Sequence, residues 1–166
     1  MATPAQESLP LIPFRFNVAF AETPLSGSKK GPVVICRGAF SECTGLEATM
    51  EPRIIREGGR NYGTILRVGR VSFATVVLKR GITDNRELAK WFQQVALGGY
   101  TYRLQVTITV QDASDTDKLS WVLQRAMPVK YKAADLNAAA SGSVGVEELH
   151  LVHEGLHEVP VDGGAT

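Results

Sequence analysis

The three histidines are the residues of this chain best suited to bind a metal ion, because they lie close together near the C-terminus. They are His150, His153 and His157. On a helix, spacings of three and seven residues would place them on one face. The surrounding sequence VEELHLVHEGL alternates well enough to form a strand, however, and a strand would point His150 and His153 to opposite faces. We therefore expect ordinary surface or interface histidines, with a small metal-binding module or enzyme as a distant alternative.

The remaining candidates for catalysis are also weak. Cys36 and Cys43 form neither a disulfide framework nor a zinc site, because no second cysteine pair exists. Cys43 could act as a nucleophile with a distant histidine, but a lone cysteine beside an apolar strand is usually a buried small hydrophobe. Gly58-Gly59 is not followed by the Gly-Lys-Ser/Thr of a phosphate loop, and no Gly-x-Ser-x-Gly elbow is present. We predict no catalytic residue, no metal, no cofactor and no enzyme.

The composition is that of one globular domain from a reducing compartment. The chain has 166 residues, 44% of them hydrophobic and 21% charged. With 18 basic and 17 acidic residues, it is neither a generally basic nucleic-acid binder nor an acidic disordered tail. No apolar run approaches the ~20 residues that span a membrane. We also expect no secretory signal, because no basic segment precedes an apolar stretch at the N-terminus.

Charge is divided unevenly along the chain. Residues 53–80 hold seven basic side chains and a single acid, Glu57, whereas residues 133–166 hold six acids and no Lys or Arg. The two regions could pair within one molecule. Alternatively, they could pair between copies, and such a heterologous contact closes into rings or continues as a filament. A nucleic-acid loop is a third interpretation, which lacks interleaved aromatic residues because Tyr62 is the only candidate.

Apolar periodicity predicts six or seven strands and one helix. The helix is expected at 85–97, with Asp84 as its N-cap and an apolar stripe of Leu88, Trp91, Phe92 and Val95. Glycine-rich residues 57–63 predict a flexible hairpin tip or a mobile loop. The strands are expected at residues 14–20, 33–35, 46–55 (an edge or bulge at Pro52), 71–79, 100–111, 121–131 (interrupted at Pro128) and 146–153.

This pattern lacks alternating βα units and so predicts an all-β-dominated, antiparallel β-sandwich or barrel with one flanking α-helix. We expect a flexible N-terminal arm at 1–12, a β domain at 13–158 and a flexible tail at 159–166. Within the strand at 100–111, the apolar face comprises Leu104, Val106, Ile108 and Val110. The opposite, polar face comprises Arg103, Gln105, Thr107 and Thr109.

The order of several short motifs resembles the tail tube proteins of contractile phages and of phage-derived contractile injection systems. The resemblance covers about residues 12–157, and departs from the family pattern at Cys43, where an aliphatic residue is expected, and in a long loop at 21–32. The motifs are FSECTGLE at 40–47, IREGGRN at 55–61, VLKRGITD at 77–84, Trp91-Phe92, Trp121, PVKY at 128–131, DLN at 135–137, VEEL at 146–149 and HEGL at 153–156.

The resemblance implies a structural subunit of the inner tube of a contractile tail or injection system. Such subunits form six-fold rings that stack into a hollow tube, and their strands join those of neighbouring subunits into one large β-barrel around the lumen. The glycine-rich 56–63 segment would then reach a neighbouring subunit or the next ring. The polar face at Arg103, Gln105, Thr107 and Thr109 would line the lumen, or alternatively face the sheath.

The implied partners are other copies of the chain, the sheath protein, the baseplate hub or spike, the tube cap, and a cargo protein or DNA in the lumen. No stable membrane insertion is expected, and assembly would take place in the cytoplasm before the protein becomes part of a phage tail or injection particle. A baseplate-proximal tube initiator or a tube cap of the same fold is the alternative. With the charge pattern, the resemblance predicts these inter-subunit residues: Arg53, Arg56, Glu57, Gly58, Gly59, Arg60, Asn61, Tyr62, Arg67, Arg70, Glu147, Glu148 and Glu154.

Overall fold

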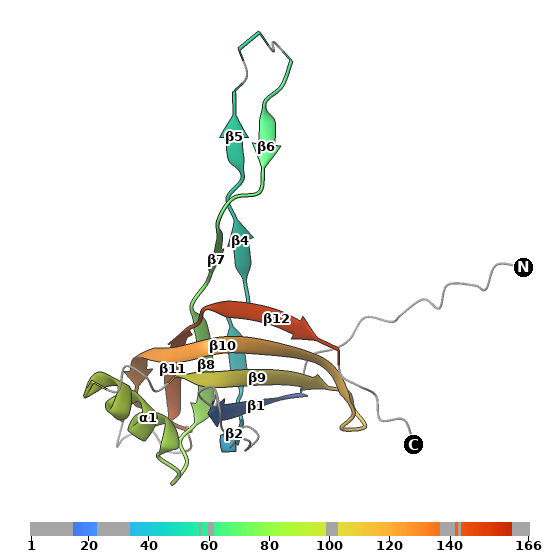
Figure 1. The fold of residues 1–166 in the computed structure, drawn as a ribbon. Coiled ribbons are helices and arrows are strands. Elements are labelled where there is room, and N and C mark those ends of the chain that lie inside the picture. The colour runs from blue at the N-terminus through green and yellow to red at the C-terminus, as the bar shows by residue number, and fades with distance from the viewer. Residues whose placement is uncertain are drawn as a thin grey trace, which may run out of the picture.

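The computed structural model describes residues 15–22, 34–56, 58–59, 62–98, 103–136, 142 and 144–160, with the backbone alone at 34–39. These residues form twelve strands and one helix (Figure 1). The strands are β1 Arg15–Glu22, β2 Val34–Ala39, β3 Glu42–Thr44, β4 Ala48–Met50, β5 Arg53–Ile55, β6 Ile65–Arg67, β7 Val71–Phe73, β8 Val76–Gly81, β9 Leu104–Gln111, β10 Asp117–Lys132, β11 Val146–Val152 and β12 Gly155–Val159; the helix is α1 Glu87–Ala96.

The body of the molecule is one antiparallel sheet in the order β2-β1-β9-β10-β11-β8-β3, with β12 also paired to β10. The sixteen-residue strand β10 joins its two halves: the first part pairs with β9 and β12, and the last part with β11. A register shift between Leu123 and Ala126, with Arg125 at φ 50°, marks a bulge between the two parts. The predicted all-β, antiparallel fold with one flanking helix is therefore confirmed.

Strand β10 continues through Pro128, where the sequence predicts an interruption. Pro128 is buried and lies opposite Leu151 of β11, and the register of the ladder shifts between Pro128 and Lys130. An irregularity in the ladder is a place where a residue without an N–H group is tolerated. The interruption predicted at Pro128 thus takes the form of a shift in pairing within one continuous strand.

A single core joins both halves of the sheet to α1. Leu104, Val106 and Ile108 of β9 are buried on one face of that strand, as their alternation predicts. Leu78 of β8 and Leu149 of β11 belong to the same cluster from the other half of the sheet. The sheet therefore curls around one set of apolar side chains.

Helix α1 covers this core with the stripe that its sequence predicts. Leu88 and Trp91 are buried, and Phe92 and Val95 are half-buried. The Trp91 ring meets Phe20 of β1 edge-on, with centroids 5.6 Å apart. The helix begins at Glu87, whose backbone N–H donates to Asn85 Oδ1 at 3.2 Å. The predicted cap at Asp84 is therefore wrong, because the helix starts later: Arg86 occupies the N-cap position without a side-chain cap, and the Asn85 side chain binds the first helical N–H. None of the helical segments in the described ranges is long and apolar enough to cross a membrane.

The described residues of the ranges 46–56, 58–59 and 62–75 leave the body as a two-stranded ribbon, which we call the hairpin arm (Figure 1). Strand β4 pairs with β7, and further out β5 pairs with β6. A glycine turn at Gly58 and Gly59 forms part of the tip. The single strand predicted at 71–79 is therefore divided, since β7 belongs to the arm and β8 to the body.

Two glycines allow the strands of the arm to approach each other closely. At Gly45, where φ is +86°, an added Cβ would lie 2.1 Å from the Thr75 carbonyl oxygen. At Gly69, an added Cβ would lie 1.6 Å from the Glu51 carbonyl oxygen. Both positions therefore require a residue without a side chain, at the base and at the middle of the arm respectively.

We predict that Gly45→Ala lowers the free energy of unfolding by about 2 kcal/mol or more, because strain at positive φ adds to the clash with the Thr75 carbonyl. Gly58→Ala is the matched control, since its φ is not in the left-handed region and no atom lies within 4 Å of an added Cβ. Chemical denaturation of both variants measures the difference. Equal stability of the two variants would contradict the proposed close approach at the base.

Candidate assembly surface

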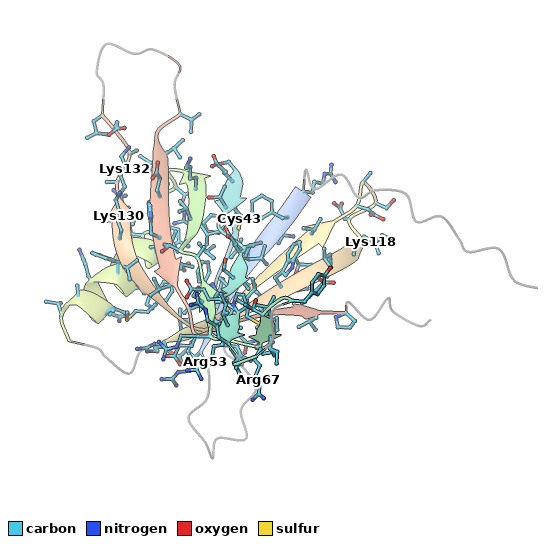
Figure 2. All side chains as sticks on the ribbon, turned by 90° about the horizontal axis from the view of Figure 1, so that it is seen from above. Cys43, Arg53, Arg67, Lys118, Lys130 and Lys132 are labelled. Carbon is cyan, nitrogen blue, oxygen red and sulfur yellow. The ribbon has the colours of Figure 1, made fainter. Side chains whose placement is uncertain are left out.

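The outer part of the hairpin arm places two arginines directly opposite each other. Arg53 of β5 pairs in register with Arg67 of β6, and Figure 2 shows the two labelled side by side. Like charges in such cross-strand positions repel. Arg53, Arg56, Arg67 and Arg70 are all exposed, and none forms an ion pair with another described residue. Within the described part of the chain, these arginines therefore form a cationic surface without ion-pair partners.

The arm also exposes two cross-strand pairs of apolar side chains. Ile54 lies opposite Leu66, and the two are 62% and 63% exposed. Met50 lies opposite Val71 nearer the body, and both are 47% exposed. A two-stranded ribbon is at best marginally stable alone, because neither face is covered. These pairs are suited to burial against another surface, and Tyr62 at the tip is 95% exposed.

Sequence reasoning missed these four apolar residues as assembly candidates. It concentrated on charge and on the glycines of the tip. Apolar residues lie on both sides of the glycine-rich tip, and this signal could have identified them. The pairing of Ile54 with Leu66, however, depends on the register of the hairpin.

Glu147, one of the predicted assembly residues, forms its contacts within its own subunit. Its carboxylate accepts a hydrogen bond from Arg80 Nε, and these two side chains are only 4% and 5% exposed. The Tyr131 hydroxyl donates to Glu147 Oε2 at 2.7 Å, and Arg80 Nη2 donates to the Asn85 carbonyl at 3.1 Å. This network ties the sheet to the segment before α1, so we leave Glu147 out of the assembly surface.

Glu154 and Glu148 also have neighbours in their own subunit. Glu154 bridges Arg103 and Arg125, and its contact to Arg125 Nε is 2.8 Å. It thereby fastens the bulge of β10 to the start of β9. Glu148 lies 3.6 Å from His150 Nε2. The intramolecular interpretation of the charge pattern thus describes several acids, whereas the arginines of the arm that the structure describes form no ion pair with other described residues. Glu57, Arg60 and Asn61 lie outside the described residues.

The polar side of β9 lies on the sheet face away from the core. Gln105, Thr107 and Thr109 are half-buried there, and the Thr109 and Ser120 hydroxyls are 3.1 Å apart. On the same face, Asn17 Nδ2 donates to Gln111 Oε1 at 2.8 Å. Arg103, at the start of this strand, is held by Glu154. The predicted lumen candidates therefore share one side of the sheet, as their alternation requires.

The three histidines occupy different environments on and between β11 and β12. His150 is half-buried on β11, His153 is buried just after it, and His157 is exposed on β12. Among the described residues, no group of three or more His, Cys, Asp or Glu side chains could hold a metal ion. A helical arrangement with all three on one face is not what the chain adopts.

His153 supports the base of the hairpin arm. Its ring lies against Phe73 of β7, with centroids 5.0 Å apart. Its Nδ1 is 3.0 Å from the Gly155 carbonyl oxygen, which can only accept, so Nδ1 carries the proton of the neutral ring. The other nitrogen, Nε2, is buried without a hydrogen-bond partner in the described structure. Burial lowers the pKa of His153 below its usual value of 6.5.

Cys43 has the character of a structural cysteine. It lies on β3, half-buried against the core cluster. Burial raises the pKa of its thiol to about 11, so the thiol stays protonated at neutral pH and is a poor nucleophile. This environment does not support the catalytic alternative for Cys43.

Comparison with known proteins matches residues 12–157 to the family model described as T4-like virus tail tube protein gp19. The chain belongs to this tail tube protein family. It is a structural tube protein of contractile, phage-tail-like systems, as the order of its motifs predicted. Membership in a structural family is consistent with the expectation that the chain is not an enzyme.

Solved structures of this fold come from several parts of such particles. A chain in the anti-feeding prophage baseplate is 27% identical, with a TM-score of 0.74. The match covers 93% of the present chain and 99% of the baseplate chain. A chain in the PVC sheath-tube complex of an extracellular contractile injection system has 18% identity and a TM-score of 0.75, over 97% and 100%. A chain in the anti-feeding prophage cap has 17% identity and a TM-score of 0.73, over 97% and 100%. No curated protein sequence matches this chain.

We predict that Glu147→Ala lowers the free energy of unfolding by about 3 kcal/mol, because it leaves the buried Arg80 guanidinium without its counter-charge. Glu148→Ala is the control on the neighbouring residue, and should cost about 1 kcal/mol or less since its carboxylate is partly exposed. Denaturant unfolding of the dissociated protein measures both. Similar stability of the two variants would show that Glu147 is not needed for the fold.

We also predict that acid weakens the base of the arm through His153. Because its folded pKa is depressed, the stability provided by the neutral ring is complete above about pH 6.5 and decreases as the pH falls from there toward the folded pKa. Wild-type protein should therefore lose more thermal stability than His153→Gln between about pH 7.5 and about pH 5. The exposed His157 provides the control, since His157→Gln should behave like wild type. Parallel pH profiles for all three proteins would refute this.

Proposed function

We propose that this tail tube protein is the repeating subunit of an inner tube, in which copies close into six-fold rings and the rings stack around a hollow lumen. The observation that carries the proposal is the hairpin arm, which projects from the body with unpaired arginines and exposed apolar pairs. Burial of the exposed apolar pairs against another molecule would stabilise the arm. In support, the related baseplate chain comes from a six-fold symmetrised structure.

Lateral contacts would form at the edges of the sheet. In the described part of the chain, one half of the sheet ends at β2 and at β12, and no strand pairs with their outer sides. Open edges invite pairing with another chain, and closure into a ring removes them. We infer that neighbouring copies join these edges into a larger barrel whose lumen is wide enough to remain water-filled.

The polar sheet face at Gln105, Thr107 and Thr109 would line that lumen. These three side chains are uncharged, the charge of Arg103 at the start of the strand is paired with Glu154, and neighbouring polar side chains on the face bond to one another. The face therefore offers few free groups to a passing molecule. The lumen would conduct DNA or a cargo protein. The sheath protein, the baseplate hub or spike and the tube cap would be the partners, with assembly in the cytoplasm.

A tube initiator next to the baseplate is the second candidate function. It is favoured by the 27% identity to a chain within a baseplate structure. An initiator would form one ring in each particle, whereas a main tube subunit would form many. Electron microscopy of native particles with a labelled subunit distinguishes the two roles.

Reversing the charge of the arm tests the proposed assembly. The double variant Arg53→Glu/Arg67→Glu should stay folded but raise the protein concentration needed for tubes about 5- to 30-fold, since each exposed ion pair contributes little. Lys90→Glu/Lys130→Glu, on the exposed surface of the body, changes the net charge equally and should have a smaller effect. Negative-stain microscopy over a concentration series measures tube formation, and circular dichroism verifies folding. Identical concentration dependence in both variants would reject the role of the arm.

A further inference from the structure

Three polar side chains lie on the core face of the sheet, near the end of the β8–β11 ladder. Arg80 of β8 is opposite Glu147 of β11, and the Glu147 carboxylate accepts hydrogen bonds from both Arg80 and Tyr131 of β10. The next pair on this face, Leu78 and Leu149, is apolar and buried. We call Arg80, Glu147 and Tyr131 the polar triad. It occupies a place in the sheet where the neighbouring pattern is apolar.

Stability alone does not explain the polar triad. The side chains of Arg80 and Glu147 are only 5% and 4% exposed, so both charges lose their water on folding. This loss of hydration offsets the attraction between the charges, and apolar side chains of similar volume are often as stable in the same place. Apolar side chains lack direction, however, whereas a hydrogen bond requires both a short distance and an aligned donor. The polar triad is therefore better suited to fix geometry than to add stability.

Two contacts connect the polar triad to α1. Arg80 Nη2 donates to the Asn85 carbonyl at 3.1 Å, two residues before the helix begins. The Tyr131 ring lies against Phe92 in the second turn of the helix, with centroids 6.4 Å apart. Both contacts are made by side chains that bind the same carboxylate. Glu147 therefore holds the helix at two points, through Arg80 before its start and through Tyr131 in its second turn.

Helix α1 is attached to the core itself through apolar side chains. Leu88 and Trp91 are buried, and the Trp91 ring meets Phe20 of β1. Trp91 Nε1 is a buried donor without a hydrogen-bond partner in the described structure, so it does not orient the helix. Apolar packing is non-directional, and cores that rely on it lose a single ordered arrangement before they lose stability. Without the polar triad, α1 could therefore stay on the sheet and yet shift or rotate along it.

We propose that the polar triad is a positioning device, which fixes the orientation of α1 on the sheet and contributes little to stability. A fixed helix gives each copy the same outer surface, on which Lys90, Gln94 and Leu97 are exposed. Copies that assemble by repeating one contact need identical surfaces, because ordering a mobile interface costs free energy on binding. This consequence for assembly rests on the proposed tube function, whereas the orientation of α1 is a property of the single subunit.

Replacing the polar triad, instead of breaking it, tests whether it serves stability. The triple variant Arg80→Met/Glu147→Leu/Tyr131→Phe keeps the side-chain volume and leaves no buried charge alone. Its midpoint of denaturant unfolding should equal or exceed that of wild type, in contrast to the loss expected for Glu147→Ala. A triple variant as unstable as Glu147→Ala would overturn the proposal, because the polar triad would then be needed for stability.

Pulsed electron paramagnetic resonance measures the orientation of α1. In a Cys36→Ala/Cys43→Ala background, one spin label is placed on α1 by Lys90→Cys. The other is placed by Lys118→Cys, at the opposite end of the body from the helix (Figures 1 and 2), and both positions are exposed. The triple variant should give a distance distribution about twofold wider than the same labelled protein with an intact polar triad. An unchanged width would overturn the proposal.

The control removes an ion pair from the other face of β8. Lys79 Nζ lies 3.0 Å from Glu42 Oε1. Successive residues of a strand point to opposite faces, so this pair is directed away from the core and from α1. Lys79→Gln/Glu42→Gln should leave the distance distribution unchanged. Widening equal to that of the triple variant would overturn the specific role of the polar triad.

A single conservative variant covers the case in which the triple variant does not fold. Arg80→Lys keeps the positive charge but lacks the fork of separate donors, Nε and Nη2, that reach Glu147 and Asn85. The backbone amides of α1 should exchange hydrogen about fivefold faster than in wild type, while those of β9 stay unchanged. Equal acceleration in α1 and β9 would indicate a global loss of stability, and no acceleration would indicate that the charge alone suffices. Either result would overturn the proposal.

Tube formation tests the consequence for assembly. The triple variant should need about tenfold more protein than wild type to form tubes in negative-stain microscopy. Tubes at the wild-type concentration would show that neighbouring copies do not depend on the orientation of α1, and would overturn this consequence. A wild-type protein that forms no tubes would instead count against the proposed function and leave the positioning of α1 intact.

Discussion

A two-stranded ribbon can pair its own backbone groups, but it cannot bury its own side chains. This constraint applies to the hairpin arm, where Ile54 and Leu66 form a cross-strand pair and yet remain mostly exposed. Within the described structure, no part of the body reaches them. The isolated subunit is therefore incomplete at this place, and a second molecule is the simplest source of the missing surface.

The body is organised to hold that arm in a fixed direction. Gly45 lets the two strands meet at the base, and Phe73 packs against the buried ring of His153. The continuous strand β10 then connects this half of the sheet to the other, through the bulge at Arg125 that Glu154 holds in place. A rigid base restricts the orientations of the arm and so lowers the entropy cost of binding.

The parts of the fold that follow from local pattern could be predicted from the sequence. The stripe on α1 and the alternation on β9 each place one face against the core, so periodicity alone identifies them. The short strands β3, β6 and β12 escaped prediction because three to five residues give too little periodicity. The shift in pairing at Pro128 was also not visible, since it depends on the register with β11.

The same distinction explains the candidate site. Counting charges was enough to locate the cationic segment, because the side chains of a hairpin that projects from the body are exposed whatever the packing elsewhere. It could not identify Glu147 as an internal partner of Arg80, because the two are 67 residues apart and meet only when β8 pairs with β11. The near-zero net charge thus combines charged residues of two kinds, those paired inside the subunit and those exposed on the arm. The Arg80–Glu147 pair is buried and belongs to the fold of the subunit. The arginines of the arm remain available for weak contacts, which become strong only when each copy in an assembly repeats them.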